Sequence, residues 1–155
     1  MKNYKAFAAI IFLAVITGFA FAFIQTNSLT PKIILPGEMK WISNPSQSGG
    51  IETIVLAGDP QKEGLYTMRV KIPAGTKLLP HWHPENRTAV ILSGTFYYNY
   101  GDSFNEDKLK EMPAGTFFTE PAGQPHFAYA KRGEVIIQVT GWGPTGTTLL
   151  QKDKK

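Results

Sequence analysis

Short apolar stretches separated by turn residues run through most of the chain after residue 50. They are rich in β-branched and aromatic residues and four to eight residues long, as β-strands are. The stretches cover residues 51–56, 65–72, 88–92, 95–100, 116–120, 126–130, 134–140 and 147–150. A helical period is nearly absent, and its best candidate is about one turn in residues 105–112. The pattern therefore predicts one all-β domain over residues 51–150.

The turns between these stretches include a repeated element, "PAGT", at residues 73–76 and 113–116. With the preceding residue, each copy puts proline second and glycine fourth, which predicts type I turns at residues 72–75 and 112–115. Each turn leads into a run that carries histidine. Regular strand spacing with such turns favours a closed β-barrel or a β-sandwich.

The first 22 residues have the pattern of a secretory signal peptide rather than of a folded domain. Lys2 and Lys5 precede an uncharged, mostly apolar run from Ala6 to Ile24, and Ala20-Phe21-Ala22 reads as a small-x-small cleavage site. Cleavage after Ala22 predicts a periplasmic or secreted protein. The run is also just long enough to span a bilayer, so an uncleaved membrane anchor is the alternative.

Residues 23–50 are polar and turn-rich, and we expect them to form an arm that wraps the domain, with Trp41 as its packing anchor. The arm could also cross to a second copy of the chain, so a homodimer stays open. Residues 151–155, "QKDKK", are expected to be a solvated tail.

The amino-acid composition excludes several kinds of site and function. The 155 residues contain no cysteine, which excludes disulfides, thiol catalysis and cysteine-based zinc sites. The formal net charge is +4, but the basic residues are scattered and do not form a stripe interleaved with aromatics. Nucleic-acid binding therefore has no support. Histidine and carboxylate are the strong metal ligands that remain.

The chain has three histidines, at His81, His83 and His126. Residues i and i+2 of a strand point to the same side, so His81 and His83 are expected to face one direction. A third ligand must come from another strand, and His126 is the histidine left to supply it. The pattern predicts a divalent metal site, and the ion could be iron, zinc, nickel, copper or manganese.

The first histidine stretch resembles the first of the two motifs that define the cupin superfamily. The motif has the form G-x5-H-x-H-x3,4-E-x6-G. This chain reads Gly75, five residues, His81, one residue, His83, three residues, Arg87, six residues and Gly94. Glycines and histidines match, and the glutamate is replaced by arginine.

The second histidine stretch resembles the second cupin motif, G-x5-P-x-G-x2-H-x3-N. Here the chain reads Gly115, five residues, Pro121, one residue, Gly123, two residues, His126, three residues and Ala130. The asparagine is replaced by alanine. The resemblance is to small single-domain bacterial cupins and extends from about residue 58 to residue 148.

This resemblance implies a small jelly-roll β-barrel of the cupin type, with a metal bound inside by His81, His83 and His126. It also implies a small-molecule ligand or substrate, on which the protein would act as a metal-dependent, oxygenase-like enzyme. The alternative is a non-enzymatic module with a degenerate site, which binds or senses a small ligand or a metal. A fold of this kind does not determine the substrate.

Arg87 changes the charge of the expected site. Three neutral imidazoles leave a divalent ion with its full charge, and an inward guanidinium would add to it, which is costly in a poorly solvated interior. Arg87 could turn outward or pair with Glu85 or Glu120. It could point inward as a catalytic residue that holds the carboxylate or enolate of a substrate. Or it could occupy the position of the metal itself.

Three further residues are candidates for the site. Glu85 lies two residues beyond His83 and could swing in as a fourth metal ligand, or it could be an exposed loop carboxylate. Glu120 could serve as a general acid or base if it faces the cavity. Tyr98 is a candidate catalytic residue because its hydroxyl could orient a metal-bound substrate.

Overall fold

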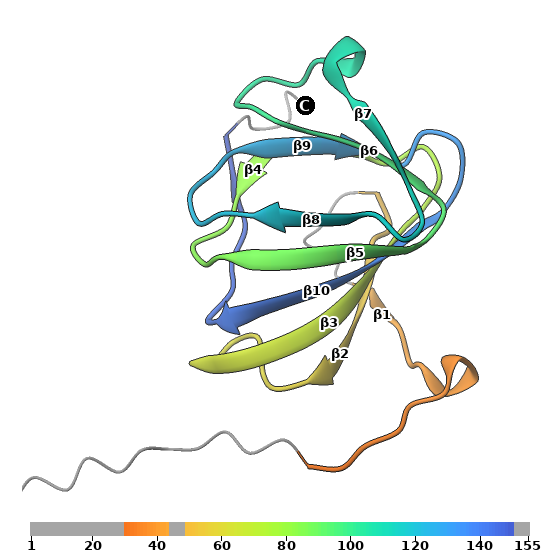
Figure 1. Ribbon diagram of the computed structural model, residues 1–155, viewed down its shortest axis with the longest axis vertical. Helices are drawn as coiled ribbons and strands as arrows, with labels where there is room; N and C mark the ends of the chain where they lie inside the picture. The colour runs from red at the N-terminus through yellow and green to blue at the C-terminus, as the bar shows by residue number, and fades with distance from the viewer. Residues whose placement is uncertain (1–29, 44–48, 151–155) are drawn as a thin grey trace, which may run out of the picture.

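The computed structural model describes residues 30–43 and 49–150, which form an assembly of short strands with two single-turn 3-10 helices (Figure 1). The helical turns are η1 (Pro36–Glu38) and η2 (Glu106–Lys108). The strands are β1 (Ile42–Ser43), β2 (Glu52–Ala57), β3 (Gly64–Ile72), β4 (Lys77–Trp82), β5 (Arg87–Ser93), β6 (Thr95–Tyr100), β7 (Lys110–Pro113), β8 (Phe117–Glu120), β9 (His126–Tyr129), β10 (Val135–Gly143) and β11 (Thr148–Leu149).

The strands form two antiparallel sheets. The first has the order β1-β2-β3-β10-β5-β8, and the second has the order β11-β4-β9-β6-β7. In Figure 1 the first sheet forms the lower part of the molecule and the second sheet forms the upper part. This arrangement confirms the all-β jelly-roll barrel that the sequence predicted.

The core lies between the two sheets and follows from the alternation of side chains along each strand. On β10, Val135, Ile137 and Val139 are buried, while the residues between them are partly exposed. The buried cluster consists of Ile51, Ile72, Ala89, Ile91, Phe96, Tyr98, Phe118, Ala128, Ala130, Val135, Ile137 and Val139. It contacts the histidine site through Tyr98, whose ring stacks on that of His126.

Besides β1 in the arm, two strands lie outside the stretches that the sequence pattern predicts. The run "KLLPHW" forms β4, although lysine and proline obscure its apolar alternation. Residues 105–112, the best helical candidate, form only the single turn η2 and then β7. Asn105 caps that turn by accepting a hydrogen bond from the backbone of Asp107 at 2.9 Å, and β7 then pairs with β6.

The repeated "PAGT" turns form one residue later than expected, and with a different conformation. The amide of Thr76 donates to the carbonyl of Pro73, and the amide of Thr116 donates to that of Pro113. Glycine is therefore the third residue of each turn, with φ of +80° at Gly75 and +90° at Gly115. A positive φ at that position belongs to a type II turn, so the prediction of type I turns is wrong.

The described part of the expected arm joins the first sheet. Strand β1 pairs with β2, and the Lys71 ammonium lies 4.3 Å from the centre of the Trp41 ring. The expected signal segment and the C-terminal tail lie outside the described residues. Among residues 30–43 and 49–150, no helix has both the length and the apolar character needed to cross a membrane.

Gly94, between β5 and β6, provides a test of this fold. Its φ is +78°, and a Cβ built there would lie 2.2 Å from the backbone oxygen of Glu134. We expect Gly94→Ala to lower the free energy of unfolding by about 2 kcal/mol or more, which corresponds to a fall in Tm on the order of 10 °C. The control is Gly133→Ala, since a Cβ there meets no atom within 4 Å. Equal melting temperatures for the two variants would contradict the backbone geometry.

Candidate metal centre

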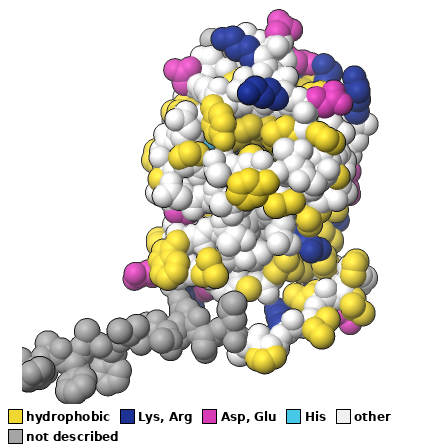
Figure 2. All heavy atoms as spheres, in the orientation of Figure 1, with side chains coloured by type: hydrophobic (Ala, Val, Ile, Leu, Met, Phe, Trp, Pro, Cys, Tyr) yellow, Lys and Arg dark blue, Asp and Glu magenta, His cyan; other side chains and the backbone are white. Residues whose placement is uncertain are grey.

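The fold brings the three histidines together inside the barrel. His81 on β4 and His126 on β9 are direct partners in the register of these two strands. His83 follows one residue after the end of β4, so the expected pair on one strand is only partly realised. All three side chains are buried, and almost no histidine is visible on the face shown in Figure 2. One ring nitrogen from each lies within 4.8 Å of the others.

Backbone carbonyls orient each imidazole through its Nδ1 atom. His81 Nδ1 lies 2.7 Å from the oxygen of Leu79, and His126 Nδ1 lies 3.1 Å from that of Gln124. His83 Nδ1 lies 2.6 Å from the oxygen of Gly146. Because a carbonyl oxygen only accepts, Nδ1 must carry the proton in each ring. In the neutral imidazole this leaves the lone pair on Nε2.

Burial keeps these rings neutral. It lowers the pKa of His81 to about 4, with His126 contributing. Burial and then the positive charge of Arg87 lower the pKa of His83 to about 3. Burial also lowers the pKa of His126. All three rings are therefore uncharged at neutral pH, which is the form that coordinates a metal.

The donor atoms at this site fit a divalent metal ion. Nε2 of His83 and Nε2 of His126 are buried and have no hydrogen-bond partner. Two buried acceptors without a donor are costly in a folded protein. Three converging imidazole nitrogens are a common protein donor set for zinc and other transition metals. Within the described residues, these three histidines form the cluster that could hold such an ion.

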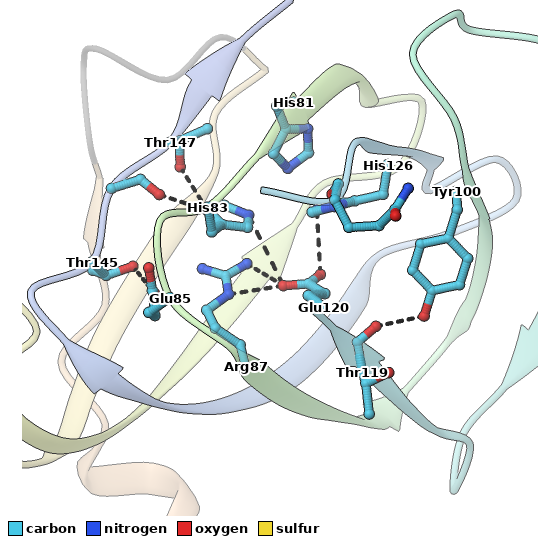
Figure 3. A network of polar contacts seen from close by, with 12 residues as sticks. His81, His83, Glu85, Arg87, Tyr100, Thr119, Glu120, His126, Thr145 and Thr147 are labelled. Carbon is cyan, nitrogen blue, oxygen red and sulfur yellow. Dashed lines mark hydrogen bonds and ion pairs between the residues drawn. The ribbon is translucent and has the colours of Figure 1, made fainter. Parts of the chain in front are cut away.

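Arg87 and Glu120 form a buried ion pair beside the histidines (Figure 3). The two residues face each other in the register of β5 and β8. Arg87 Nε donates to Glu120 Oε2 at 2.8 Å, and Arg87 Nη2 donates to the same oxygen. Of the placements expected from the sequence, the structure therefore shows the ion pair with Glu120, made inside the barrel.

The carboxylate of Glu120 also faces two of the histidines. Its Oε1 lies 3.5 Å from His126 Nε2, and its Oε2 lies 3.9 Å from His83 Nε2. Burial acts to raise the pKa of Glu120, but the positive charge of Arg87 and its hydrogen bonds to the carboxylate outweigh burial and lower that pKa. Glu120 is therefore an ionised carboxylate at the site, available as a proton acceptor or as an oxygen ligand.

The structure does not bring Glu85 into the group of converging ligand atoms. Its Oε1 accepts hydrogen bonds from Tyr66, at 2.6 Å, and from Thr145. Its side chain is half-buried rather than exposed. Neither expectation for Glu85, a fourth ligand or an exposed loop carboxylate, describes this arrangement, in which it ties β3 to the loop after β10.

Tyr98 lies beside the centre as a ring that stacks on His126, with the centroids 5.4 Å apart and the planes at 27°. Its side chain is buried. Burial, then the negative charge of Glu120 and the neighbouring Tyr100, raise the pKa of Tyr98 far above its usual range. The hydroxyl therefore keeps its proton and can act only as a donor or a neutral acceptor.

Sequence reasoning did not identify the groups that orient the imidazoles. Two of them are carbonyls two residues before the histidine, at Leu79 and Gln124, and any residue can supply these. Gly146 is different, since it lies 63 positions from His83 and reaches it through the loop after β10. In that loop, Thr147 Oγ1 also lies 3.4 Å from His83 Nδ1. The glycine-rich run "GWGPTG" covers the end of β10 and the start of this loop, but it does not indicate that the loop contacts His83.

Comparisons with known proteins bear on the family of this chain. A family model described as the ChrR cupin-like domain matches residues 30–144. None of the curated proteins compared with the chain matches it.

Many solved structures are similar to this chain. DMSP lyase DddQ from Ruegeria pomeroyi is 17% identical over 84% of this chain and 86% of its own, with a TM-score of 0.62. The polyketide cyclase RemF from Streptomyces resistomycificus is 16% identical over 80% and 89%, with a TM-score of 0.62. KdgF from Halomonas sp. is 20% identical over 74% and 96%, with a TM-score of 0.55. At these identities the likeness shows the fold.

Proposed function

The chain belongs to the family of ChrR cupin-like domains, and its two histidine motifs had indicated the wider cupin superfamily. From this membership and the geometry of the site, we propose that it binds one divalent metal ion through His81, His83 and His126 and acts on a small organic molecule. The observation that supports this proposal most strongly is the protonation and orientation of the three imidazole rings. Each has Nδ1 on a backbone carbonyl, so three Nε2 lone pairs are left for an ion.

The net positive charge of the proposed metal centre favours an anionic substrate. Three neutral imidazoles do not offset the charge of a divalent ion, and the positive Arg87 is already paired with Glu120. A buried centre with an uncompensated double positive charge is costly unless an anion joins it. A small molecule with a carboxylate or an enolate would supply that anion at the open positions.

The chemistry would combine the ion with Tyr98. A bound divalent ion would act as a Lewis acid that polarises an oxygen of the substrate. Tyr98 keeps its proton and stacks on His126, so its hydroxyl is placed to donate a hydrogen bond to a substrate oxygen. Ionised Glu120 is the group near the centre that could accept a proton.

The named neighbours support a reaction on a small molecule but do not select one reaction. One is named as a lyase and another as a polyketide cyclase. The oxygenase-like activity predicted from the sequence stays a proposal that depends on a redox-active metal. Oxygen consumption by the iron-loaded protein separates it from lyase or isomerase chemistry, which a zinc-loaded protein would support.

We also propose that the protein is exported, as a periplasmic or secreted protein. The support is the sequence of residues 1–22, with two lysines, an apolar run and a small-x-small cleavage site.

Metal content tests the proposed function directly. We expect the protein, purified without added metal or chelator, to contain about one equivalent of a transition metal by elemental analysis. His126→Ala should lose it, because two imidazoles hold such an ion far more weakly than three. The control is Thr88→Ala, an exposed position on β5, which should keep the metal. An empty wild-type protein that stays empty after reloading with iron, zinc, nickel, copper and manganese would refute metal binding.

N-terminal sequencing tests export. Protein recovered from the periplasm or the medium should begin at Phe23, the residue after the expected cleavage site. Protein that stays in the membrane fraction with Met1 or Lys2 at its N-terminus would instead identify the segment as an uncleaved anchor.

A further inference from the structure

The carboxylate missing from the first histidine motif has a counterpart directly across the sheet. Arg87 takes the motif's glutamate position on β5, and Glu120 is its register partner on β8. We propose that Glu120 is a fourth, oxygen ligand of the metal centre, and that Arg87 is the residue that positions it. This inference rests on the proposed metal binding and adds a ligand to it.

The register of β5 and β8 explains why a carboxylate on β8 can take the place of the motif's glutamate on β5. Residues directly opposite in an antiparallel pair have Cβ atoms about 4.5–5.5 Å apart and point to the same face. Arg87 precedes the inward-facing Ala89 by two residues, and Glu120 follows the inward-facing Phe118 by two. Both side chains therefore enter the barrel at the same level, so either position can present a carboxylate to the histidines.

The distances between Glu120 and the imidazoles favour Glu120 as a metal ligand rather than as a group outside the coordination sphere. Glu120 Oε1 lies 3.5 Å from His126 Nε2, an atom that is buried without a hydrogen-bond partner. The proton of that ring is on Nδ1, which lies 3.1 Å from the Gln124 carbonyl. A lone pair of the carboxylate thus faces a lone pair of the imidazole, and a cation is the species that attracts both.

Arg87 holds only one of the two oxygens. Its Nε and Nη2 both donate to Glu120 Oε2, whereas Oε1 is the oxygen nearer to His126. The guanidinium thereby fixes the carboxylate rotamer and compensates its charge before a metal arrives. Outer groups that orient a ligand in this way commonly affect metal affinity. Arg87 is a positioning residue in this account.

A second glutamate, the half-buried Glu85, provides a matched control. Glu85 lies two residues after His83 in sequence, and its carboxylate, like that of Glu120, is hydrogen-bonded, in this case to Tyr66 and Thr145. The converging group of ligand atoms contains neither glutamate, but Glu120 has its two oxygens 3.5 Å and 3.9 Å from imidazole Nε2 atoms, whereas the hydrogen bonds of Glu85 go to hydroxyl groups. Glu85→Gln and Glu120→Gln therefore remove the same charge by the same substitution at two positions, only one of which faces the histidines.

The experiment measures Co²⁺ affinity of the metal-free, full-length protein by competition with a chromophoric chelator, together with the visible absorption of the Co²⁺ form. We expect Glu120→Gln to weaken Co²⁺ binding by more than about 100-fold, beyond the usual effect of an outer group, and to change the absorption bands. Glu85→Gln should change the affinity less than about threefold, with an unchanged spectrum.

A double variant that exchanges the two side chains tests whether metal binding is recovered. The double variant R87E/E120R returns the carboxylate to β5 and the guanidinium to β8. Since the two positions are register partners, we expect it to bind Co²⁺ within about tenfold of wild type. If Glu120→Gln does not fold, Glu120→Asp, which keeps the charge but shortens the reach, should weaken binding in the same direction.

The outcomes separate this inference from the proposed function. Wild-type protein that takes up no Co²⁺ refutes metal binding itself before any variant is compared. Wild-type protein that binds Co²⁺, with Glu120→Gln and Glu85→Gln equal to it in affinity and spectrum, refutes only the role of Glu120. Loss in Glu120→Gln with recovery in the double variant supports both.

Discussion

The candidate metal centre depends on one constraint, which is the hydrogen bond from Nδ1 of each imidazole to a backbone carbonyl. Each bond assigns the proton of its ring and so points the Nε2 lone pair away from the backbone. Two of the acceptors lie two residues before their histidine. The third, at Gly146, requires the loop after β10 to close over His83. The barrel places the histidines through the register of β4 and β9, but the carbonyls make them a converging set of ligands.

The ion pair of Arg87 and Glu120 balances the two charges that lie beside the three neutral imidazoles. A lone arginine beside three imidazoles would oppose a cation, and a lone buried carboxylate would be costly without one. The register of β5 and β8 pairs them directly, so their opposite charges cancel within the site. With a divalent ion bound, the site would keep the full charge of the ion, and an anionic substrate would offset that charge.

Much of the fold and the three histidines were predictable, because strand alternation and motif spacing are local properties of the sequence. The pairing of Arg87 with Glu120 was open among several alternatives, since it depends on the register of two strands 33 residues apart. The same limit applies to Gly146, whose carbonyl has no sequence signature. The position of Glu85 next to His83 in sequence did not indicate the partners of its carboxylate, Tyr66 and Thr145, which come from distant parts of the chain. The turn at Gly75 was misjudged because several turn types accept the same residues.

The proposed metal site requires three neutral imidazoles that are protonated on Nδ1 and direct their unprotonated Nε2 atoms at one point. Nitrogen NMR of the histidine rings in the metal-free protein at neutral pH tests it most directly, since the ¹⁵N shifts distinguish the two tautomers and the charged ring. We expect a proton on Nδ1 alone in His81, His83 and His126. We also expect zinc to shift all three Nε2 resonances together, with saturation at about one equivalent. A proton on Nε2 of any of the three, or a doubly protonated ring, would contradict this arrangement.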